Sequence, residues 1–474
     1  MKNSRRGFIN NILSGSIGAG TIPLFSFISG EKGTKARGKE LPVIHEADIC
    51  VLGGSCTGVF AAVRAARLGA KVVIIEKQNA FGGVATNSLV NVWHSLLDTE
   101  FKRPIIAGLT LEMMDRLMVR HAAAKDNNNQ SVGFTFNSQE LKIELDELII
   151  EAGIHPYLHT LFSEPYLDKH GKLIGVIVDN KSGRGIINAK YFIDATGDGD
   201  LCHRLGMDSF ENDLLQPPTT CAHFDRWNDK EFYDLLKKYG HEFNIPDGFV
   251  WGKNIPASKS YMLAGTRVLH LNCAIGDDLT KAEMEGRRQI RAIMDMIRKY
   301  GSPEKTGLVA LPSHIGIRET RHIKCMYQVT EEDTLYGKHF EDAIANGSYR
   351  LDLHHQEKPG ITFKYLDGTQ VYSRPGFPNE TSLWREKMAI NPTFYQVPLR
   401  SIIPQKFDNV MIAGRMLDAS KMAFSGIRVM VNMNQLGEAA GVTSWLAMNQ
   451  NKPVQAVKAT DVRTEMAKGG SLII

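Results

Sequence analysis

ICVLGGSCTGVFAAVRAARLGAKVVIIEK, residues 49–77, decides the fold of this 474-residue chain. Residues 48–53 form a short apolar run with β-branched side chains, which is typical of a buried parallel strand. The alanine-rich run after Gly58 ends at Gly69, where a helix would be capped, and AKVVIIEK gives a second apolar strand. Strand, glycine turn, helix and strand in this order predict a βαβ unit of the dinucleotide-binding kind.

The turn GGSCTG departs from the pattern G-x-G-x-x-G, because Ser55 stands where a second glycine is expected. Gly53 permits the tight turn, Gly58 lets helix and strand approach, and the middle position brings the backbone close to a pyrophosphate. Serine is the smallest replacement that carries a side chain, and its hydroxyl could donate to a phosphate oxygen. Glu76 lies about 20 positions beyond the turn, where a ribose hydroxyl needs a carboxylate. The alternative is a plain βαβ packing unit.

The composition is that of an ordinary globular protein, with 43% hydrophobic and 23% charged residues. The length allows two or three domains. A net charge of +4 does not indicate nucleic-acid binding. The cysteines show neither C-x-x-C nor zinc-like spacing with histidine, so we predict no metal site and no essential disulfide. They are Cys50, Cys56, Cys202, Cys221, Cys273 and Cys325.

The amino terminus differs in character from the rest of the chain. Arg5 and Arg6 lie beside each other in NSRRGFINN (3–11), and a weakly apolar stretch rich in glycine and serine follows at 9–30. This resembles a twin-arginine export signal, which implies passage through the twin-arginine translocon, already folded, to a periplasmic or extracytoplasmic location. The alternative is a chance Arg-Arg before a tail. A stable membrane span is disfavoured because Gly, Ser, Asn and Pro interrupt the stretch.

Four further stretches extend the dinucleotide-binding pattern. After Glu76, the loop at 77–91 contains a Gly82-Gly83 pair and Thr86. Residues 172–201 alternate as strand, Asn/Ser-Gly turn and strand, a β-meander, before an apolar strand enters ATGDGD. Near the carboxyl end, 407–420 predicts a strand and loop, and 426–448 predicts a helix that carries alanine and glycine.

Taken together, these blocks resemble the FAD-dependent oxidoreductase family, flavoproteins of the two-dinucleotide-binding-domain kind. The matching blocks are GGSCTG, FGG, ATGDGD, GIRETR, AGR and IRVMVNMNQLGEAAG, within roughly residues 46 to 450. The resemblance implies an α/β fold with a Rossmann-like, glutathione-reductase-like FAD-binding domain and an inserted α+β substrate or cap domain. We expect a signal at 1–30, a linker at 31–45, FAD-binding parts at 46–204 and 396–474, and the cap at 205–395.

The resemblance also implies which residues hold FAD. The turn would wrap around the pyrophosphate, and Glu76 would bind the adenosine ribose. The GG loop would approach the flavin. Residues 425–429 would present backbone N–H groups at a helix N-terminus to the flavin edge that becomes negative on reduction. The implied cofactor-binding residues are Gly53, Gly54, Ser55, Gly58, Glu76, Gly83, Thr86, Asp198, Gly414, Arg415, Ser425, Gly426, Arg428 and Val429.

Candidate catalytic residues follow the cofactor blocks. GIRETRHI (316–323) contains Arg318 and Arg321, and an arginine near a flavin can clamp a carboxylate or stabilise an oxyanion. Strand alternation would put 319, 321 and 323 on one face and 318, 320 and 322 on the other. The alternative is an Arg–Glu pair with a structural role.

Histidines supply a second group of candidates. His94, just after the GG loop, is the first candidate for a general base, with a pKa near neutrality if unperturbed. A purely structural histidine is the alternative. The adjacent histidines of LDLHHQE (351–357) would face opposite ways on a strand, which favours solvent or cap packing over a metal site.

The sequence therefore predicts an exported FAD-dependent oxidoreductase that transfers hydride between flavin and a small organic substrate, with carbohydrate-derived molecules among the candidates. A single dinucleotide turn excludes a second Rossmann domain for NAD(P)H, so the electron acceptor is unknown. One alternative is a reductase of an activated double bond, like fumarate reductase. The other is a non-catalytic FAD-scaffold binding protein.

Overall fold

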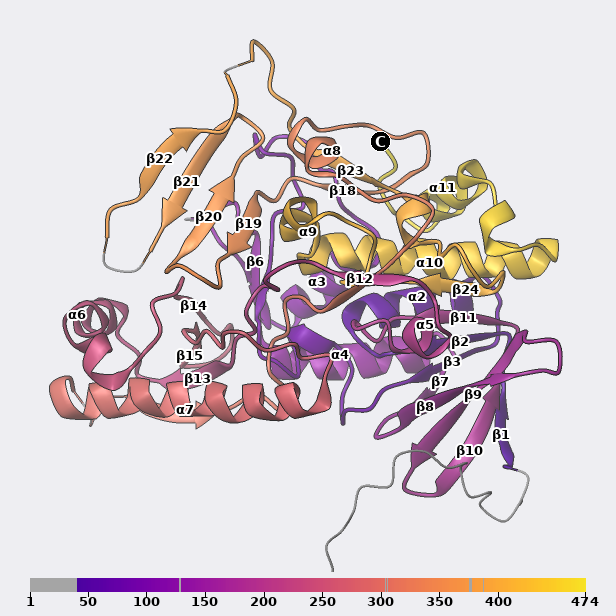
Figure 1. Ribbon diagram of the computed structural model, residues 1–474, viewed down its shortest axis with the longest axis horizontal. Coiled ribbons are helices and arrows are strands. Elements are labelled where there is room, and N and C mark those ends of the chain that lie inside the picture. The colour runs from indigo at the N-terminus through magenta and orange to yellow at the C-terminus, as the bar shows by residue number, and fades with distance from the viewer. Residues whose placement is uncertain (1–40, 128, 303, 305, 375–376, 387) are drawn as a thin grey trace, which may run out of the picture. The chain divides into compact units, whose positions relative to one another are not determined.

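The computed structural model describes residues 41–474 except 128, 303, 305, 375–376 and 387, and residues 41–474 form one compact unit (Figure 1). The predicted export signal and most of the predicted linker lie outside the described residues. The last linker residues do not: β1 (Val43–Glu46) is a strand that pairs in parallel with β10 (Gly183–Asn188). The division at 204 and 395 stays a prediction.

A five-stranded parallel sheet in the order β24-β11-β2-β3-β7 holds the dinucleotide turn. Every residue of β2 and β3 is buried, which explains their continuous apolar runs. The predicted α/β class with a Rossmann-type sheet is confirmed. The strands are β2 (Ile49–Leu52), β3 (Val72–Ile75), β7 (His155–Tyr157), β11 (Tyr191–Asp194) and β24 (Val410–Ile412).

Two helices pack against each other beside this sheet. α2 (Cys56–Arg67) joins β2 to β3. α10 (Met430–Gln450) crosses α2 and packs against it. A Cβ on Gly437 would lie 2.1 Å from the Thr57 carbonyl oxygen, and one on Gly441 would lie 2.2 Å from that of Ala61. The glycines let the two backbones approach closely. The other helices near this layer are α3 (Leu109–Val119), α4 (Ser138–Glu151), α5 (Asp200–Arg204), α9 (Lys421–Ile427) and α11 (Ala459–Lys468).

The predicted β-meander forms a second sheet, in the order β1-β10-β9-β8. β9 (Leu173–Asn180) pairs antiparallel with β10 from Gly183↔Asn180 onward, which places the turn at Lys181-Ser182. β8 (Leu161–Leu167) is the edge strand opposite β1.

The middle of the chain builds its own sheet and core. Its sheet has the order β14-β15-β13-β16, and the 25-residue helix α7 (Gly276–Tyr300) lies along it (Figure 1). Acidic residues in the first turn of α7 and basic residues in its last turn complement the helix dipole. The strands are β13 (Cys221–Asp225), β14 (Trp251–Asn254), β15 (Ser260–Ala264) and β16 (Gly307–Ala310), and α6 (Asp229–Tyr239) also packs here.

A four-stranded antiparallel sheet in the order β19-β20-β21-β22 follows, seen at the upper left of Figure 1. Its strands are β19 (Leu351–His354), β20 (Ile361–Lys364), β21 (Thr369–Ser373) and β22 (Glu380–Leu383). The remaining elements are β4 (Val92–Trp93), β5 (Ala123–Lys125), β6 (Phe134–Phe136), β12 (Ser209–Glu211), β17 (Arg321–Ile323), α8 (Glu331–Leu335), β18 (Ala343–Gly347) and β23 (Tyr395–Pro398). Among the described residues, no helix is long and apolar enough to cross a membrane.

Candidate active site

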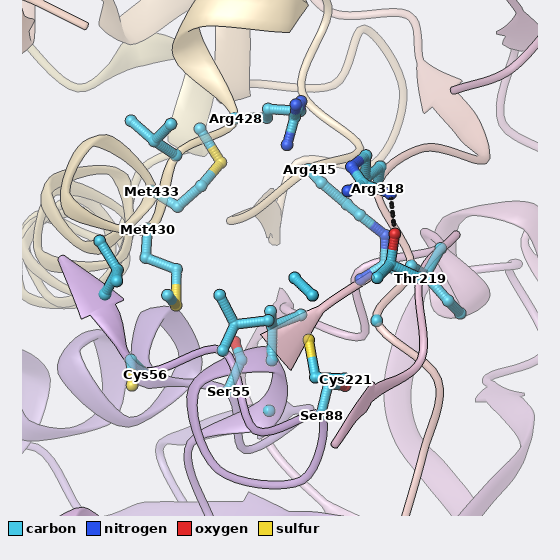
Figure 2. Close-up of a pocket in the computed structure, with 18 of the residues that line it drawn as sticks. Ser55, Cys56, Ser88, Thr219, Cys221, Arg318, Arg415, Arg428, Met430 and Met433 are labelled. Carbon is cyan, nitrogen blue, oxygen red and sulfur yellow. Dashed lines mark hydrogen bonds between the residues drawn. The ribbon is translucent and has the colours of Figure 1, made fainter. Parts of the chain in front are cut away.

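One cavity of about 490 Å³ begins at the dinucleotide turn and extends between the sheets of the middle region. Ser55 and Glu76 line the end of the cavity at this turn. Arg318 and Asp352, which come much later in the sequence, line the same cavity. Figure 2 shows Met430 and Met433 on one side of the cavity, facing Arg318 and Thr219 on the other. Residues from both expected groups, cofactor-binding and catalytic, therefore line one cavity, Ser55, Glu76 and Arg318 among them.

The turn requires glycine at both of its ends. Gly53 has a φ of +101°, and a Cβ there would lie 2.3 Å from the carbonyl oxygen of Ala195. A Cβ on Gly58 would lie 1.9 Å from the carbonyl oxygen of Gly53. Neither Gly53 nor Gly58 lines the cavity itself, nor does Gly54, so these glycines act by shaping the backbone.

Ser55 has a defined structural function in this turn. It is the N-cap of α2, and its Oγ accepts a hydrogen bond from the Gly58 N–H at 3.3 Å. The first N–H groups of a helix have no intrahelical acceptor, so those of Cys56 and Thr57 remain for a ligand. Ser55, Cys56 and Thr57 all line the cavity. Helix dipole and free N–H groups together suit a pyrophosphate.

Glu76 is held rigidly at the end of β3. One carboxylate oxygen accepts from the Gly54 N–H and the other from the Gln78 N–H, each at 2.7 Å. Burial raises the pKa of Glu76, against the effect of these donors. In the described part of the chain no cation forms an ion pair with Glu76, although it lines the cavity. Its remaining lone pairs fit the hydroxyl groups of a ribose.

The two expected residues of the GG loop, Gly83 and Thr86, have different positions: one lines the cavity and the other supports the loop. Gly83 lines the cavity beside Ser55, whose Cβ would be 2.9 Å from a Cβ on Gly83. Thr86 does not line it: this buried side chain donates to the Phe81 carbonyl at 2.6 Å. Thr86 thus fixes the shape of the loop.

Asp198 and Arg415 form a buried ion pair beside the cavity, which they line together with Gly414. Thr320 donates to the Asp198 carboxylate at 2.7 Å. Burial acts to raise the pKa of Asp198, but Arg415 and Thr320 outweigh it and lower the pKa. The Nε of Arg415 is buried without a partner among the described residues, so it remains available to a ligand.

Residues 425–429 are only partly at a helix N-terminus. α9 ends at Ile427, and α10 begins after its N-cap, Val429. Arg428 and Val429 line the cavity, whereas Ser425 and Gly426 are buried in the last turn of α9. The expectation of an N-terminal position is therefore wrong for these two. A Cβ on Gly426 would lie 3.0 Å from Leu351, which indicates that this turn packs on β19.

Arg318 lines the cavity, and in the part of the chain that the structure describes it forms no ion pair with a glutamate. Its Nη1 donates to the Pro217 carbonyl and to the Thr219 hydroxyl, both uncharged. Burial lowers the pKa of Arg318 to about 10.

The segment before β17 does not alternate as a strand, because regular pairing begins only at Arg321. Glu319 and His322, expected on opposite faces, lie 3.3 Å apart between Oε1 and Nε2. Thr320 and Arg321, also expected on opposite faces, both contact Asp198. Arg321 does not line the cavity and lies 3.5 Å from the Asp200 carboxylate.

His94 lines the cavity between Ser131 and Tyr349. Its Nδ1 lies 3.2 Å from the Ser131 carbonyl, which requires a proton on Nδ1 and leaves the lone pair on Nε2. Burial, with the charges of Arg350 and Arg428, lowers the pKa of His94 to about 3. This pKa lies far below the near-neutral value expected of an unperturbed ring, so the ring is neutral at physiological pH.

Sequence analysis missed Arg350 and Asp352. Together with His354 they line the cavity, so Asp352 and His354 share one face of β19, and Arg350, directly before the strand, lies on the same side. This period-two pattern of polar side chains was visible in the sequence. His355 lies outside the strand and contacts Thr362, as the opposite orientation of adjacent histidines predicts. In the described ranges, no group of three or more His, Cys, Asp or Glu side chains could hold a metal ion.

The fold and site define a class of protein: an α/β enzyme with one dinucleotide cradle that opens into a substrate-sized cavity. The family model for FAD-dependent oxidoreductases matches residues 48–466, and the chain belongs to this family. FAD is its cofactor.

Other known proteins are similar over part or most of the chain. Thiamine thiazole synthase from Methanococcus aeolicus is 29% identical over 216 residues, 44% of this chain and 74% of that protein. The synthase from Methanococcus maripaludis is 27% identical over 34% of this chain and 60% of its own length. A geranylgeranyl bacteriochlorophyll reductase-like protein from Thermoplasma acidophilum superposes with a TM-score of 0.43, 12% identity, and coverage of 90% of this chain and 82% of that one. The p-nitrophenol 4-monooxygenase from Pseudomonas putida superposes with a TM-score of 0.44 and 9% identity, and the match covers 90% of this chain and 85% of that one.

Replacing Cys56 by alanine should leave FAD binding nearly unchanged. The buried thiol donates to the Gly82 carbonyl, with Sγ 3.6 Å from the oxygen, and burial raises its pKa to about 12, so it is not a reactive thiolate. We expect the Kd for FAD to change by less than about threefold and stability to fall by about 1 kcal/mol. Flavin titration of the apoprotein measures the first, with Gly58→Ala as a control that should lose FAD. A large loss of FAD in Cys56→Ala would contradict this interpretation.

His94 should make the protein less stable in acid. Because its folded-state pKa falls from 6.5 to about 3, the unfolded chain binds the proton more readily in this window. The free energy of unfolding therefore falls as the pH drops from 6.5 towards 3. His94→Gln should flatten this slope by up to about one proton, read from Tm against pH, while replacement of the exposed His170 should not. Identical slopes for His94→Gln and wild type would refute the assignment.

Proposed function

We propose that this FAD-dependent oxidoreductase is exported and oxidises a small hydroxyl-bearing molecule, with carbohydrate-derived metabolites as the first class to screen. The observation that supports it best is the continuity of one cavity from the dinucleotide turn to the polar residues His94, Arg318 and Asp352. Bound FAD supplies the two-electron acceptor.

The chain's own residues divide into two groups. The N-terminus of α2, Glu76 and Arg415 would hold the dinucleotide, as their free N–H groups, lone pairs and unpartnered Nε suit it. His94 would receive a hydrogen bond from the substrate hydroxyl at its Nε2 lone pair. Because its pKa is low, His94 would orient the substrate hydroxyl through this hydrogen bond and would not retain its proton.

A reductase of an activated double bond is the second candidate. It is favoured by Arg318, whose pKa is lowered to about 10 by burial and which lines the cavity. An arginine in this state is a better proton donor than one in water. The electron donor would then be a separate reductant of unknown identity.

Export is tested separately from catalysis. Changing Arg5 and Arg6 together to lysine should retain the full chain in the cytoplasm if the twin-arginine translocon carries it. Cell fractionation measures this, with the unaltered chain as the control. Equal export of both forms would contradict the proposed route.

The central experiment is anaerobic substrate screening of the purified yellow protein. Alcohols and sugars that bleach the visible flavin band would support oxidation. Reoxidation of the chemically reduced protein by α,β-unsaturated acids would instead support the reductase. If no alcohol or sugar bleaches the flavin and an unsaturated acid reoxidises it, the proposed function is wrong and the second candidate replaces it.

A further inference from the structure

Three arginines from separate elements line the same part of the cavity. Arg318 precedes β17, Arg350 precedes β19, and Arg428 lies between α9 and α10. Figure 2 shows Arg428 at the top of the cavity, between Met433 on one side and Arg318 on the other. We call Arg318, Arg350 and Arg428 the arginine wall.

The arginine wall has more positive than negative charge. Asp352 accepts from Arg428 at 2.5 Å and from the Tyr349 hydroxyl at 2.8 Å, so Arg428 has its counter-ion. Arg318 donates only to a carbonyl and a hydroxyl. Arg350 donates to the Ser131 hydroxyl at 3.1 Å and lies 4.3 Å from the centre of the Phe363 ring. Within the described residues, no carboxylate lies within ion-pair distance of Arg318 or Arg350, and the charge of Asp352, already paired with Arg428, acts on both from farther away.

Neighbouring groups do not supply the missing negative charge. His94 and His354 line the cavity close to the arginine wall, and burial with these positive charges lowers the pKa of both. They stay neutral and add no charge. The Nε atoms of Arg350 and Arg428 are buried without partners in the part of the chain that the structure describes. Burying a guanidinium without an anion is costly, so a ligand that brings one gains binding free energy.

A carboxylate presents two coplanar oxygens, which match the two parallel N–H groups of a guanidinium. This inference rests on the proposed function: we infer that the substrate carries a carboxylate, and that Arg318 and Arg350 bind it. Arg428 is held in place by Asp352 and completes the wall. The reacting hydroxyl or double bond then lies on the same molecule as the carboxylate, which makes the substrate an organic acid such as an acidic sugar.

The test compares acids with neutral molecules of matched shape on the FAD-loaded protein. Glucuronate is compared with glucose, and malonate with malonamide, by the shift of the visible flavin band and by calorimetry. We expect the acids to bind at least about tenfold more tightly. Arg318→Gln and Arg350→Gln should each remove about tenfold of this preference, whereas Arg291→Gln on the exposed face of α7 should not.

Several outcomes overturn the inference. Equal affinity for acid and neutral partner, absence of binding by both acids, or unchanged affinity in the glutamine variants would each do so. Tighter binding of glucose 6-phosphate than of glucuronate would overturn the choice of carboxylate. If a glutamine variant loses FAD, Arg350→Lys serves as the second variant, because it keeps the positive charge but lacks the two parallel N–H groups of the guanidinium. It should weaken acid binding without loss of FAD.

The inference and the proposed function can fail separately. If the acids bind through the arginine wall but no alcohol or sugar bleaches the flavin, only the proposed function fails. If a neutral alcohol is oxidised and acids do not bind, only the carboxylate inference fails.

Discussion

Gly437→Leu should prevent the protein from folding into an FAD-binding form. A Cβ at position 437 would lie 2.1 Å from the Thr57 carbonyl oxygen, and this neighbour is helix backbone that cannot turn aside. α10 would have to move away from α2, whose N-terminus lines the cavity at the dinucleotide turn. We expect a loss of at least about 3 kcal/mol of stability and no bound FAD, measured by thermal unfolding and by the flavin content of the purified protein.

A glycine of the same chain provides the matched control. Gly276 is the first residue of α7, and nothing lies within 4 Å of the Cβ that alanine would add. Gly276→Ala should leave FAD content unchanged, and stability should rise by at most about 1 kcal/mol. Gly441→Ala should resemble Gly437→Leu in direction, because its Cβ would lie 2.2 Å from the Ala61 carbonyl oxygen. A fully loaded Gly437→Leu protein with wild-type Tm would show that the helix crossing tolerates side chains.

The cofactor half of the fold was predictable because its signals are local. Apolar runs, turn glycines and the acid after β3 are short-range features, and the strands β2 and β3 and the meander follow from them. The break between α9 and α10 was not predictable, since GIRVM contains no proline and its glycine lies inside α9. There, packing of the last turn of α9 against Leu351 accompanies the break.

The substrate half of the site depends on contacts between distant segments. The pKa of His94 is lowered by Arg350 and Arg428, which reach it from elements far along the chain. No spacing rule brings these three residues together. The alternation of Arg350, Asp352 and His354 was readable as one strand face, but only the structure shows that this face lines the cofactor cavity.

Arg64→Met should destabilise the protein by about 3–5 kcal/mol, because it leaves a buried carboxylate without its cation. Arg64 on α2 donates through Nε to the Glu438 carboxylate on α10 at 2.7 Å, and Glu438 is fully buried. The Ser471 hydroxyl and the Leu109 N–H also donate to it, at 3.0 and 3.1 Å, and these neutral donors cannot replace the positive charge. Urea unfolding measures the loss.

The same helix offers an exposed pair for comparison. Arg67 contacts Glu112 through two nitrogens at 2.7 and 2.8 Å, with both side chains about a third exposed, so Arg67→Met should cost less than about 1 kcal/mol. Equal losses for Arg64→Met and Arg67→Met would show that burial is not what makes the Arg64 pair important. Arg64→Met with Glu438→Met should recover part of the stability, because the unpaired charge is gone.

The pH dependence of Arg64→Met separates an unpaired charge from lost packing. Burial raises the pKa of Glu438 even beside Arg64, and removal of Arg64 should raise it further. A raised folded-state pKa means that the folded variant binds the proton more tightly than the unfolded chain, so its stability falls as the pH rises through this window. The difference in unfolding free energy between wild type and Arg64→Met should therefore shrink as the pH is lowered and Glu438 takes up its proton. A difference that stays constant with pH would assign the loss to packing of the Arg64 side chain instead.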